Sequence, residues 1–285
     1  MRSFKHVYIE IINSCQFHCS FCPKTKRKPQ VMTQEEFKYI LSEVQQLTNT
    51  IYLHVLGEPL LHPELDALLA IAADFHLFVN ITTNGYLLHA MAPILLKHHH
   101  IKKINISLHS MEDIGQNAYS LTQYLKEITS FADQATRQIP TTIMYRLWNT
   151  NGQYGAILNY LQDYYQPQAP LLPEASPQNG HRLAYRIFLH QQHAFEWPVQ
   201  AQQKQASLHD GCCLALKTHI AILADGTVVP CCLDSEGQLA LGNIHKTPLT
   251  ALLQTPRATA MREGFQAQKA VEAVCRQCTY KQRFE

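Results

Sequence analysis

The chain has 285 residues, of which 46% are hydrophobic and 16% charged, and its formal net charge is +2. This charge is too small to indicate a nucleic-acid or membrane partner, and no apolar run reaches the roughly 18 residues of a membrane span. The N-terminus lacks the small-residue cleavage site of a signal peptide, so we expect a cytoplasmic protein of one large domain or two unequal ones.

The first part of the chain alternates β-branched segments with amphipathic ones. Strands are predicted at 6–12, 51–56, 78–83, 103–109, 141–148 and 184–190. Helices are predicted at 34–47, 63–75, 87–97, 118–134 and 153–164, and Thr33 with Glu36 forms a capping-box signature for the first of them. Such units in series indicate an α/β fold with a parallel sheet. Six strands are too few to close an eight-stranded barrel, so we expect a partial (β/α)6 TIM-like barrel over residues 1–197.

The pattern changes in residues 198–285, where we expect a small Cys-rich domain. The segment 219–232 predicts a hairpin around Asp225-Gly226, a strong turn signal. The segment 249–266 predicts a helix. Because this region has more cysteine than apolar core, we expect its folding to depend on a metal.

The nine cysteines of the chain favour metal or redox chemistry over disulfides in a cytoplasmic protein. They fall into three groups: Cys15, Cys19 and Cys22; Cys212, Cys213, Cys231 and Cys232; Cys275 and Cys278. The first group has the spacing C-x3-C-x2-C. Three thiolates can bind three irons of a four-iron cluster and leave the fourth iron open. A three-Cys zinc site or unrelated thiols would also account for this spacing.

The segment SCQFHCSFCP, with Phe21 directly before the last Cys, resembles the cluster motif of the radical S-adenosylmethionine (SAM) superfamily. In that family the open iron of a [4Fe–4S] cluster chelates the amine and carboxylate of SAM. An electron then cleaves SAM to methionine and a 5′-deoxyadenosyl radical, which takes a hydrogen atom from the substrate. The resemblance therefore implies a cluster on Cys15, Cys19 and Cys22, SAM as cofactor, and an external electron donor of the flavodoxin or ferredoxin type.

The resemblance also implies where SAM binds, because parallel barrels build their sites at the C-terminal ends of the strands. Gly57-Glu58-Pro59 is similar to the family's Gly-Gly-Glu-Pro motif for the methionyl amine, with Leu56 in place of the first Gly. The other contacts implied are Phe21 against the adenine, Thr83 and Asn84 near SAM and the substrate, Ser107 on the ribose or carboxylate, and Arg146 on the carboxylate. Each of these could instead be an ordinary barrel residue.

Two strands of the predicted barrel carry a polar face. Asn105, Ser107 and His109 alternate with apolar residues, and such a face can line a barrel cavity. A buried guanidinium at Arg146 would suit a bidentate grip on a carboxylate. No catalytic acid or base can be assigned, although His109 and His190 are candidates.

The later cysteines resemble a second module. Twelve residues separate Cys213 from Gly226, and Gly-x4-Cys231 follows, which resembles the opening of the SPASM auxiliary iron–sulfur domain. Cys275 and Cys278 would complete four ligands for one auxiliary [4Fe–4S] cluster, and because the chain ends seven residues later we expect the shortened form called a twitch domain. Neighbouring residues on an extended backbone point to opposite faces, so Cys212 and Cys232 are left over, with Cys212 as the main alternative ligand. A structural zinc ribbon is the competing interpretation.

A cluster with four Cys ligands has no open iron and would accept or relay an electron. We therefore expect a radical SAM oxidoreductase that oxidises a small molecule or modifies or crosslinks a peptide. Only fourteen residues precede Cys15, which favours a small substrate or a separate recognition protein. The alternative is a non-catalytic iron–sulfur redox sensor or electron carrier, which would explain the cysteines but not Gly57-Glu58-Pro59.

Overall fold

The computed structural model describes residues 4–113, 120–148, 154–172, 180–193, 195–203 and 210–284. These residues belong to two compact units. The first unit comprises Met1–Cys15, Pro23–Phe78 and Phe195–Glu285, and the second comprises Gln16–Cys22 and Val79–Ala194. The first unit thus contains both the start of the chain and its Cys-rich end. None of the described helices is long and apolar enough to cross a membrane.

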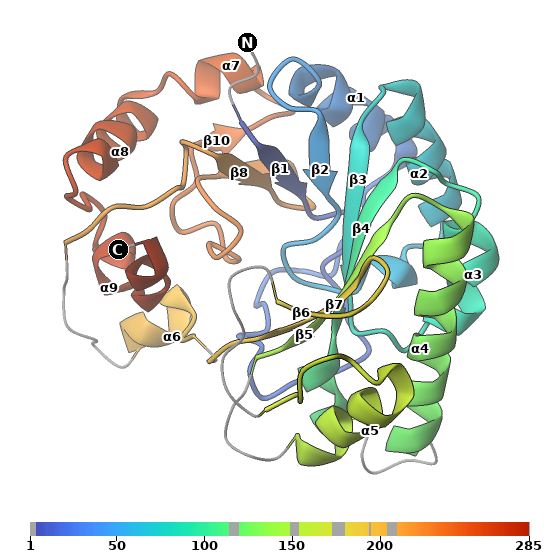
Figure 1. Ribbon diagram of the computed structural model, residues 1–285. Helices are drawn as coiled ribbons and strands as arrows, with labels where there is room; N and C mark the ends of the chain where they lie inside the picture. Colours follow the sequence, from blue (N-terminus) through green and yellow to red (C-terminus); the bar gives the residue numbers. More distant parts are fainter. Residues whose placement is uncertain are drawn as a thin grey trace. The chain divides into compact units, whose positions relative to one another are not determined.

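The sheet of the first unit is built around β1 (His6–Ile9) (Figure 1). Strand β1 pairs in parallel with β2 (Thr50–Tyr52) on one side and with β8 (His219–Ile222) on the other. Strands β9 (Thr227–Val229) and β10 (Gly242–Asn243) extend the sheet in antiparallel fashion beyond β8. The hairpin predicted around Asp225-Gly226 is confirmed, and Gly226 has the positive φ of 81° that its turn requires.

Two segments of the first unit test helices predicted from the sequence. The capping box of α1 (Gln34–Val44) is confirmed, since Thr33 Oγ1 accepts the Glu36 N–H and Glu36 Oε2 accepts the Thr33 N–H. The helical segment predicted at 249–266 is confirmed, but it is interrupted. It is divided into α7 (Leu249–Leu252) and α8 (Pro256–Gln266), because Pro256 lacks the N–H that would continue α7 and instead occupies the first turn of a new helix. The remaining helical segments are α2 (Leu65–Asp74), α6 (Pro198–Gln203), α9 (Ala273–Gln277), and the 3-10 turns η1 (Pro59–Leu61) and η3 (Thr279–Phe284).

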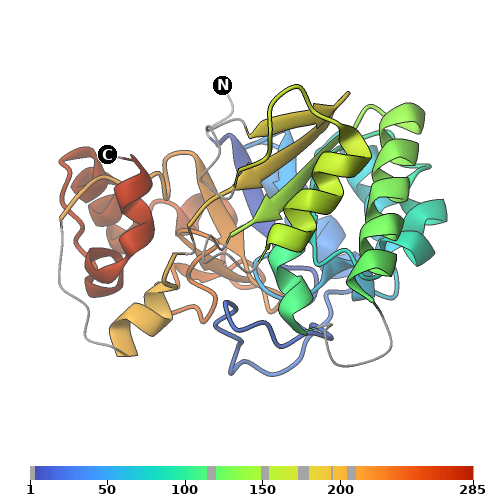
Figure 2. The same cartoon turned by 60° about the horizontal axis from the view of Figure 1, so that its bottom comes forward.

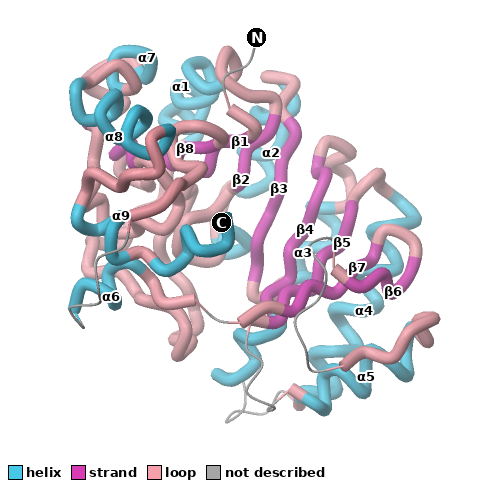
Figure 3. Tube along the Cα trace, turned by 60° about the vertical axis from the view of Figure 1, so that its left-hand side comes forward, coloured by secondary structure: helices cyan, strands magenta, loops and turns pink. Residues whose placement is uncertain are grey.

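The second unit has an open, mostly parallel sheet, in which the strands lie side by side with β6 at the edge (Figure 3). Its strands are β3 (Phe78–Thr83), β4 (Ile101–Ser107), β5 (Thr142–Leu147), β7 (Ile187–Gln191) and β6 (His181–Ala184), in that spatial order. Only β6 is antiparallel to its neighbour. The strand predicted at 184–190 is confirmed as β7 over most of its length, but Tyr185-Arg186 at its start form the turn of a β6–β7 hairpin, with Arg186 at a positive φ of 58°.

One face of this sheet is covered by helices, namely α3 (Leu88–Leu95), α4 (Leu121–Gln138) and α5 (Gly155–Tyr165) (Figure 1). Helices α4 and α5 lie next to each other (Figure 2), where the Tyr164 hydroxyl donates to Asp133 Oδ2 at 2.9 Å. Ile104 and Ile106 of β4 are fully buried, whereas Lys103 and Ser107 on the opposite face are partly exposed. The strand residues thus divide into an apolar face and a polar face, as the alternation in the sequence predicts.

Candidate functional site

The first cysteine group is divided between the two units, with Cys15 in the first and Cys19 and Cys22 in the second. The Cys15 residue is exposed, and the other two are partly exposed. The Cys22 N–H donates to the Cys19 carbonyl at 3.0 Å, which closes a turn between them. All nine cysteines are free thiols, so no disulfide competes with metal binding.

The backbone just before Cys15 packs against the Gly57-Glu58-Pro59 segment. The Glu58 N–H donates to the Ser14 carbonyl at 2.9 Å. Glu58 is 2% exposed, and its Oε1 accepts the Leu60 N–H at 3.0 Å, which caps the short turn η1. Part of the carboxylate therefore stabilises its own turn and fixes the direction of the side chain.

No other residue type can replace Gly57 without strain where this segment packs against the backbone before Cys15. Its φ is +76°, and an added Cβ would lie 2.2 Å from the Ile12 carbonyl oxygen. We expect Gly57→Ala to lower the melting temperature and raise the KM for SAM, since strain of about 1–3 kcal/mol would displace Glu58. The matched control is Gly155→Ala, where no atom of the described residues lies within 4 Å of an added Cβ. Equal KM values in both variants would contradict this role for Gly57.

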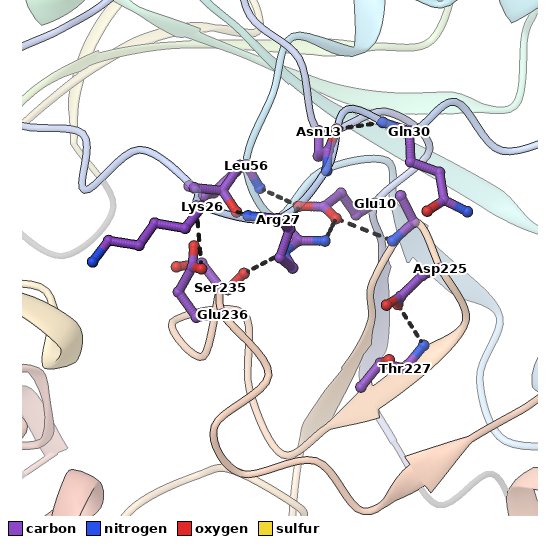
Figure 4. A network of polar contacts seen from close by, with 12 residues as sticks. Glu10, Asn13, Lys26, Arg27, Gln30, Leu56, Asp225, Thr227, Ser235 and Glu236 are labelled. Carbon is purple, nitrogen blue, oxygen red and sulfur yellow. Dashed lines mark hydrogen bonds and ion pairs between the residues drawn. The ribbon is translucent and has the colours of Figure 1, made fainter.

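A buried ion pair that the sequence analysis missed lies beside this segment (Figure 4). Glu10 is 0% exposed and accepts two hydrogen bonds of 2.7 Å from the Arg27 guanidinium. Its two oxygens also accept the Leu56 N–H at 3.1 Å and the Ala224 N–H at 3.0 Å. Arg27 Nε donates to the Ser235 carbonyl at 2.8 Å. The only signal in the sequence was a charged residue inside an apolar strand, which when buried requires a partner.

This pair joins segments that are far apart in the sequence. Glu10 follows β1, Arg27 lies five residues after Cys22, and Leu56 precedes Gly57. Burial alone would lower the pKa of Arg27, but the hydrogen bonds and charge of Glu10, with the nearby charges of Glu236 and Asp225, raise it above its ordinary value. The guanidinium is therefore charged at every pH at which the protein folds, and the pair acts as a fixed brace between these backbones.

The polar face of the second unit brings together several of the predicted SAM contacts. The parallel register aligns Ser107 of β4 with Arg146 of β5, and Arg146 with His190 of β7. Residues aligned in this way project from the same face of a parallel sheet. Arg146 is partly exposed rather than buried as expected. Its guanidinium carbon lies 5.5 Å from the centre of the Trp148 ring, a cation–π distance.

Phe21 contacts two rings of the same unit. Its ring lies edge-on to His109 at 5.7 Å and to Trp148 at 5.6 Å between centroids. The His109 and Trp148 rings are stacked, 5.3 Å apart and within 8° of parallel. The His109 Nδ1 atom lies 3.3 Å from the Arg146 carbonyl, to which it donates when protonated. Trp148 was not predicted as a site residue, and its position one residue past β5 was the available signal.

The end of β3 holds Asn84 in a defined turn. Asn84 is 7% exposed, and its Oδ1 accepts the Tyr86 N–H at 3.0 Å and a longer bond of 3.4 Å from Gln16. The Thr83 hydroxyl accepts the Gly85 N–H at 3.0 Å, and Thr83 is aligned with fully buried Ile106. The Thr83 side chain is therefore on the apolar face, and Thr82, aligned with Asn105, occupies the polar one.

The later cysteines gather around one cavity of the first unit. Cys213, Cys231, Cys275 and Cys278 all line a cavity of about 340 Å³. Burial raises the pKa of each thiol, and the charges of the other cysteines raise the pKa of Cys231 and Cys275 further. Thiols that affect one another in this way lie close together, and a metal that binds thiolates would relieve the cost of burying them.

The donor set fits an iron–sulfur cluster by its chemistry. Four thiols converge on a space walled by apolar side chains such as Leu239, Phe265 and Val274. Within the described ranges, no three His, Cys, Asp or Glu side chains are arranged for a single metal ion. A four-iron cluster spaces its ligands more widely, since each thiolate binds a different iron.

The two remaining cysteines differ in their surroundings. Cys212 lines a separate space of about 100 Å³ and not the larger cavity. Cys232 does line the larger cavity, but it also packs against an apolar group made of Val55, Ala221, Leu223 and Val229. The side chain of Cys232 is therefore shared between the cavity and this apolar group.

Other groups hold the walls of this cavity in place. Lys281 is 2% exposed and its ammonium donates to the carbonyls of Cys275 and Arg276, at 2.9 Å each, which satisfies the end of α9. His6 and His219 are stacked 5.5 Å apart, and burial lowers the pKa of each to about 4. Both rings are thus neutral near pH 7 and add no positive charge beside the thiols.

Comparison with protein families gives two matches. The radical SAM superfamily model matches residues 9–151, half of the chain. The SPASM model, described as an iron–sulfur cluster-binding domain, matches residues 212–279. In these families the radical SAM domain binds a [4Fe–4S] cluster and SAM, and the SPASM domain binds auxiliary iron–sulfur clusters.

Similar sequences include two cyclases. The chain is 28% identical over 114 residues to a probable GTP 3′,8-cyclase from Pyrobaculum aerophilum, and 32% identical over 121 residues to GTP 3′,8-cyclase from Trichodesmium erythraeum. Each match covers 39% of this chain but only 36% and 37% of the respective cyclase. The chain thus matches little more than a third of the length of these relatives.

Solved structures extend the similarity to nearly the whole fold. BtrN in complex with AdoMet and 2-DOIA has a TM-score of 0.63 at 17% identity, over 98% of this chain and 94% of BtrN. SuiB from Streptococcus suis bound to S-adenosylmethionine has a TM-score of 0.62 at 14% identity, over 91% of this chain and 68% of SuiB. At these identities the similarity shows the fold alone, and it confirms the predicted α/β partial barrel. The chain therefore belongs to the radical SAM superfamily and carries a C-terminal SPASM domain.

Proposed function

We propose that this protein is a radical SAM oxidoreductase whose auxiliary cluster accepts an electron from the substrate radical. The observation that carries the proposal is the convergence of four partly buried thiols, those of Cys213, Cys231, Cys275 and Cys278, on one cavity. Four Cys ligands leave no iron open for substrate, so such a cluster serves electron transfer. That role is useful where a substrate radical must lose a second electron, as in dehydrogenation or crosslinking.

The first cluster would be held by Cys15, Cys19 and Cys22. When bound, it and SAM supply the abstraction of a hydrogen atom from the substrate. Glu58, whose direction is fixed by its bond to the Leu60 N–H, would bind the methionyl amine between Gly57 and Pro59. Arg146 and Ser107, aligned on one face, would bind the carboxylate or ribose. Asn84 would add a polar contact, Thr83 would contribute through its backbone, and Phe21 would lie near the adenine.

The auxiliary cluster would be of the single-cluster, twitch type. The chain's own residues there bury the ligands, exclude water with Leu239 and Phe265, and hold α9 through Lys281. We propose the barrel over residues 1–197 and the auxiliary domain over 198–285, which contains the SPASM match at 212–279. The compact units divide the chain differently because β8 pairs with β1.

The substrate would be a small molecule or a peptide, and the electron donor a flavodoxin- or ferredoxin-type protein. Both kinds of substrate occur among similar structures, since BtrN was solved with 2-DOIA and SuiB with the precursor peptide SuiA. Membership of the radical SAM superfamily favours an enzyme over the non-catalytic iron–sulfur protein considered from the sequence.

The test is SAM cleavage by anaerobically reconstituted protein with dithionite. We expect 5′-deoxyadenosine from the wild type and a loss of at least a hundredfold in Cys22→Ala, because the cluster would lose a ligand. The wild type should hold about eight irons, and a Cys15/Cys19/Cys22 triple variant about four. A protein that holds both clusters yet releases no 5′-deoxyadenosine would contradict the proposed enzyme.

A further inference from the structure

Lys103 is a cation on the polar face of the second unit. It is the third residue of β4, a strand that lies between β3 and β5 in the sheet (Figure 1). The register aligns it with Asn80 of β3 and Thr142 of β5, so its side chain shares their face. The preceding residue, Lys102, has no partner in the register with β3, because the register shifts between Val79 and Asn80.

Nothing described on this face neutralises Lys103. No ion pair or hydrogen bond of its ammonium group occurs within the described part of the chain. The aligned residues of the face are polar, apolar or cationic: Asn80, Thr82, Asn105, Ser107, Thr142, Met144, Arg146, Phe188 and His190. None of them is a carboxylate.

The charge of Lys103 is unfavourable in this setting. Burial lowers the pKa of its ammonium group, and the nearby positive charge of Arg146 lowers it further. Among the described residues no hydrogen-bond partner is found for the buried Oδ1 atoms of Asn80 and Asn105, which as acceptors suit an N–H or O–H donor of a ligand and not its anionic group. A half-buried cation with no carboxylate beside it, next to polar groups without partners, is typical of a binding site rather than of a structural contact.

The spacing along β4 separates Lys103 from the proposed SAM contacts. Lys103 precedes Ser107 by four residues, or about 13 Å of strand at 3.3 Å per residue. Ser107 is level with Arg146, to which we assign the SAM carboxylate. The two residues therefore leave β4 and β5 at different levels of the face, and we assign them to two different anionic groups.

We propose that Lys103 binds an anionic oxygen-bearing group of the substrate, a phosphate or a carboxylate. This inference rests on the proposed function, because it presumes a substrate beside SAM in the same unit. A lysine suits this purpose since its ammonium attracts either group as a point charge. Arg146 raises the local positive potential and thereby strengthens the attraction.

The first test measures anion binding to SAM-loaded holoprotein by calorimetry, with inorganic phosphate and malonate as the probes. For the probe that the wild type binds more tightly, we expect Lys103→Gln to lower the affinity at least tenfold and Lys103→Arg to retain it. Lys102→Gln is the matched control and should bind as the wild type does. The tighter probe identifies the group as phosphate or carboxylate. Binding of neither probe by the wild type, or equal binding by Lys103→Gln, would overturn the proposal.

Two further readouts separate this site from the SAM site and from a structural role. The KM for SAM in the dithionite-driven cleavage should be unchanged in Lys103→Gln but raised in Arg146→Gln, and a rise in Lys103→Gln would reassign the residue to SAM. In ligand-free protein Lys103→Met should raise the melting temperature, because it removes an unpaired charge. A lower melting temperature would mean that Lys103 stabilises the fold. Anion binding does not require SAM cleavage, so failure of the proposed enzyme activity would be distinguishable.

Discussion

Replacing Arg27 by Met is expected to cost about 3–5 kcal/mol of folding free energy, because Glu10 would keep its charge without a partner. Glu10 is 0% exposed, and two of its four hydrogen bonds come from Arg27. The other two come from backbone N–H groups and cannot neutralise it. Anaerobic urea unfolding followed by circular dichroism measures the change.

Two variants sharpen this prediction. In Glu10→Gln with Arg27→Met the charge is absent while an amide oxygen still accepts a backbone N–H, so the double variant should be more stable than Arg27→Met alone. Lys26→Met removes a neighbouring exposed charge and should leave the urea midpoint unchanged. A midpoint for Arg27→Met equal to that of Lys26→Met would show that the pair contributes little.

Removal of one auxiliary ligand has the second large effect. We expect Cys231→Ala to lower the iron content of the reconstituted protein from about eight to about four per chain. Because metal binding and folding are coupled in small metal domains, the region after residue 210 should also become sensitive to protease. Iron and sulfide assays with limited proteolysis measure both effects.

The adjacent cysteines provide the controls. Cys212 lies outside the cavity of the other thiols, so Cys212→Ala should keep about eight irons. Cys232→Ala should also keep them, at some loss of packing against Val229 and its neighbours. Loss of the auxiliary iron in Cys212→Ala but not in Cys231→Ala would show that Cys212, and not Cys231, is a ligand of the auxiliary cluster.

Local patterns in the sequence were sufficient for most of the fold. Thr33 with Glu36 and Asp225 with Gly226 each predict a turn or cap from chemistry within four residues, and both are confirmed. The hairpin at Tyr185-Arg186 was missed because neither residue is one of the usual turn formers, and Arg186 adopts its positive φ without that signal. Pro256 is a signal for a break between two helices, but the helical spacing of the apolar residues around it obscured that signal.

Long-range contacts explain what could not be predicted at the candidate sites. Glu10 and Ala224 are 214 residues apart, and no spacing rule connects them. Cysteine spacing predicted four thiols that do line one cavity, but it left out Cys232, which lines the same cavity, and it could not exclude Cys212, which is adjacent to Cys213 in the sequence. The packing of Trp148 on His109 depends on two strand ends that only the folded sheet aligns.

The parallel pairing of β1 with β8 bears on how the protein is made. Strand β1 begins at His6, yet its partner on one side begins at His219. A ribosome must therefore deliver more than two hundred residues before that edge of β1 can be covered, and an uncovered strand edge invites pairing with other chains. Glu10 directly follows the same strand and receives the Ala224 N–H equally late, and a charged residue beside an uncovered strand edge discourages premature association.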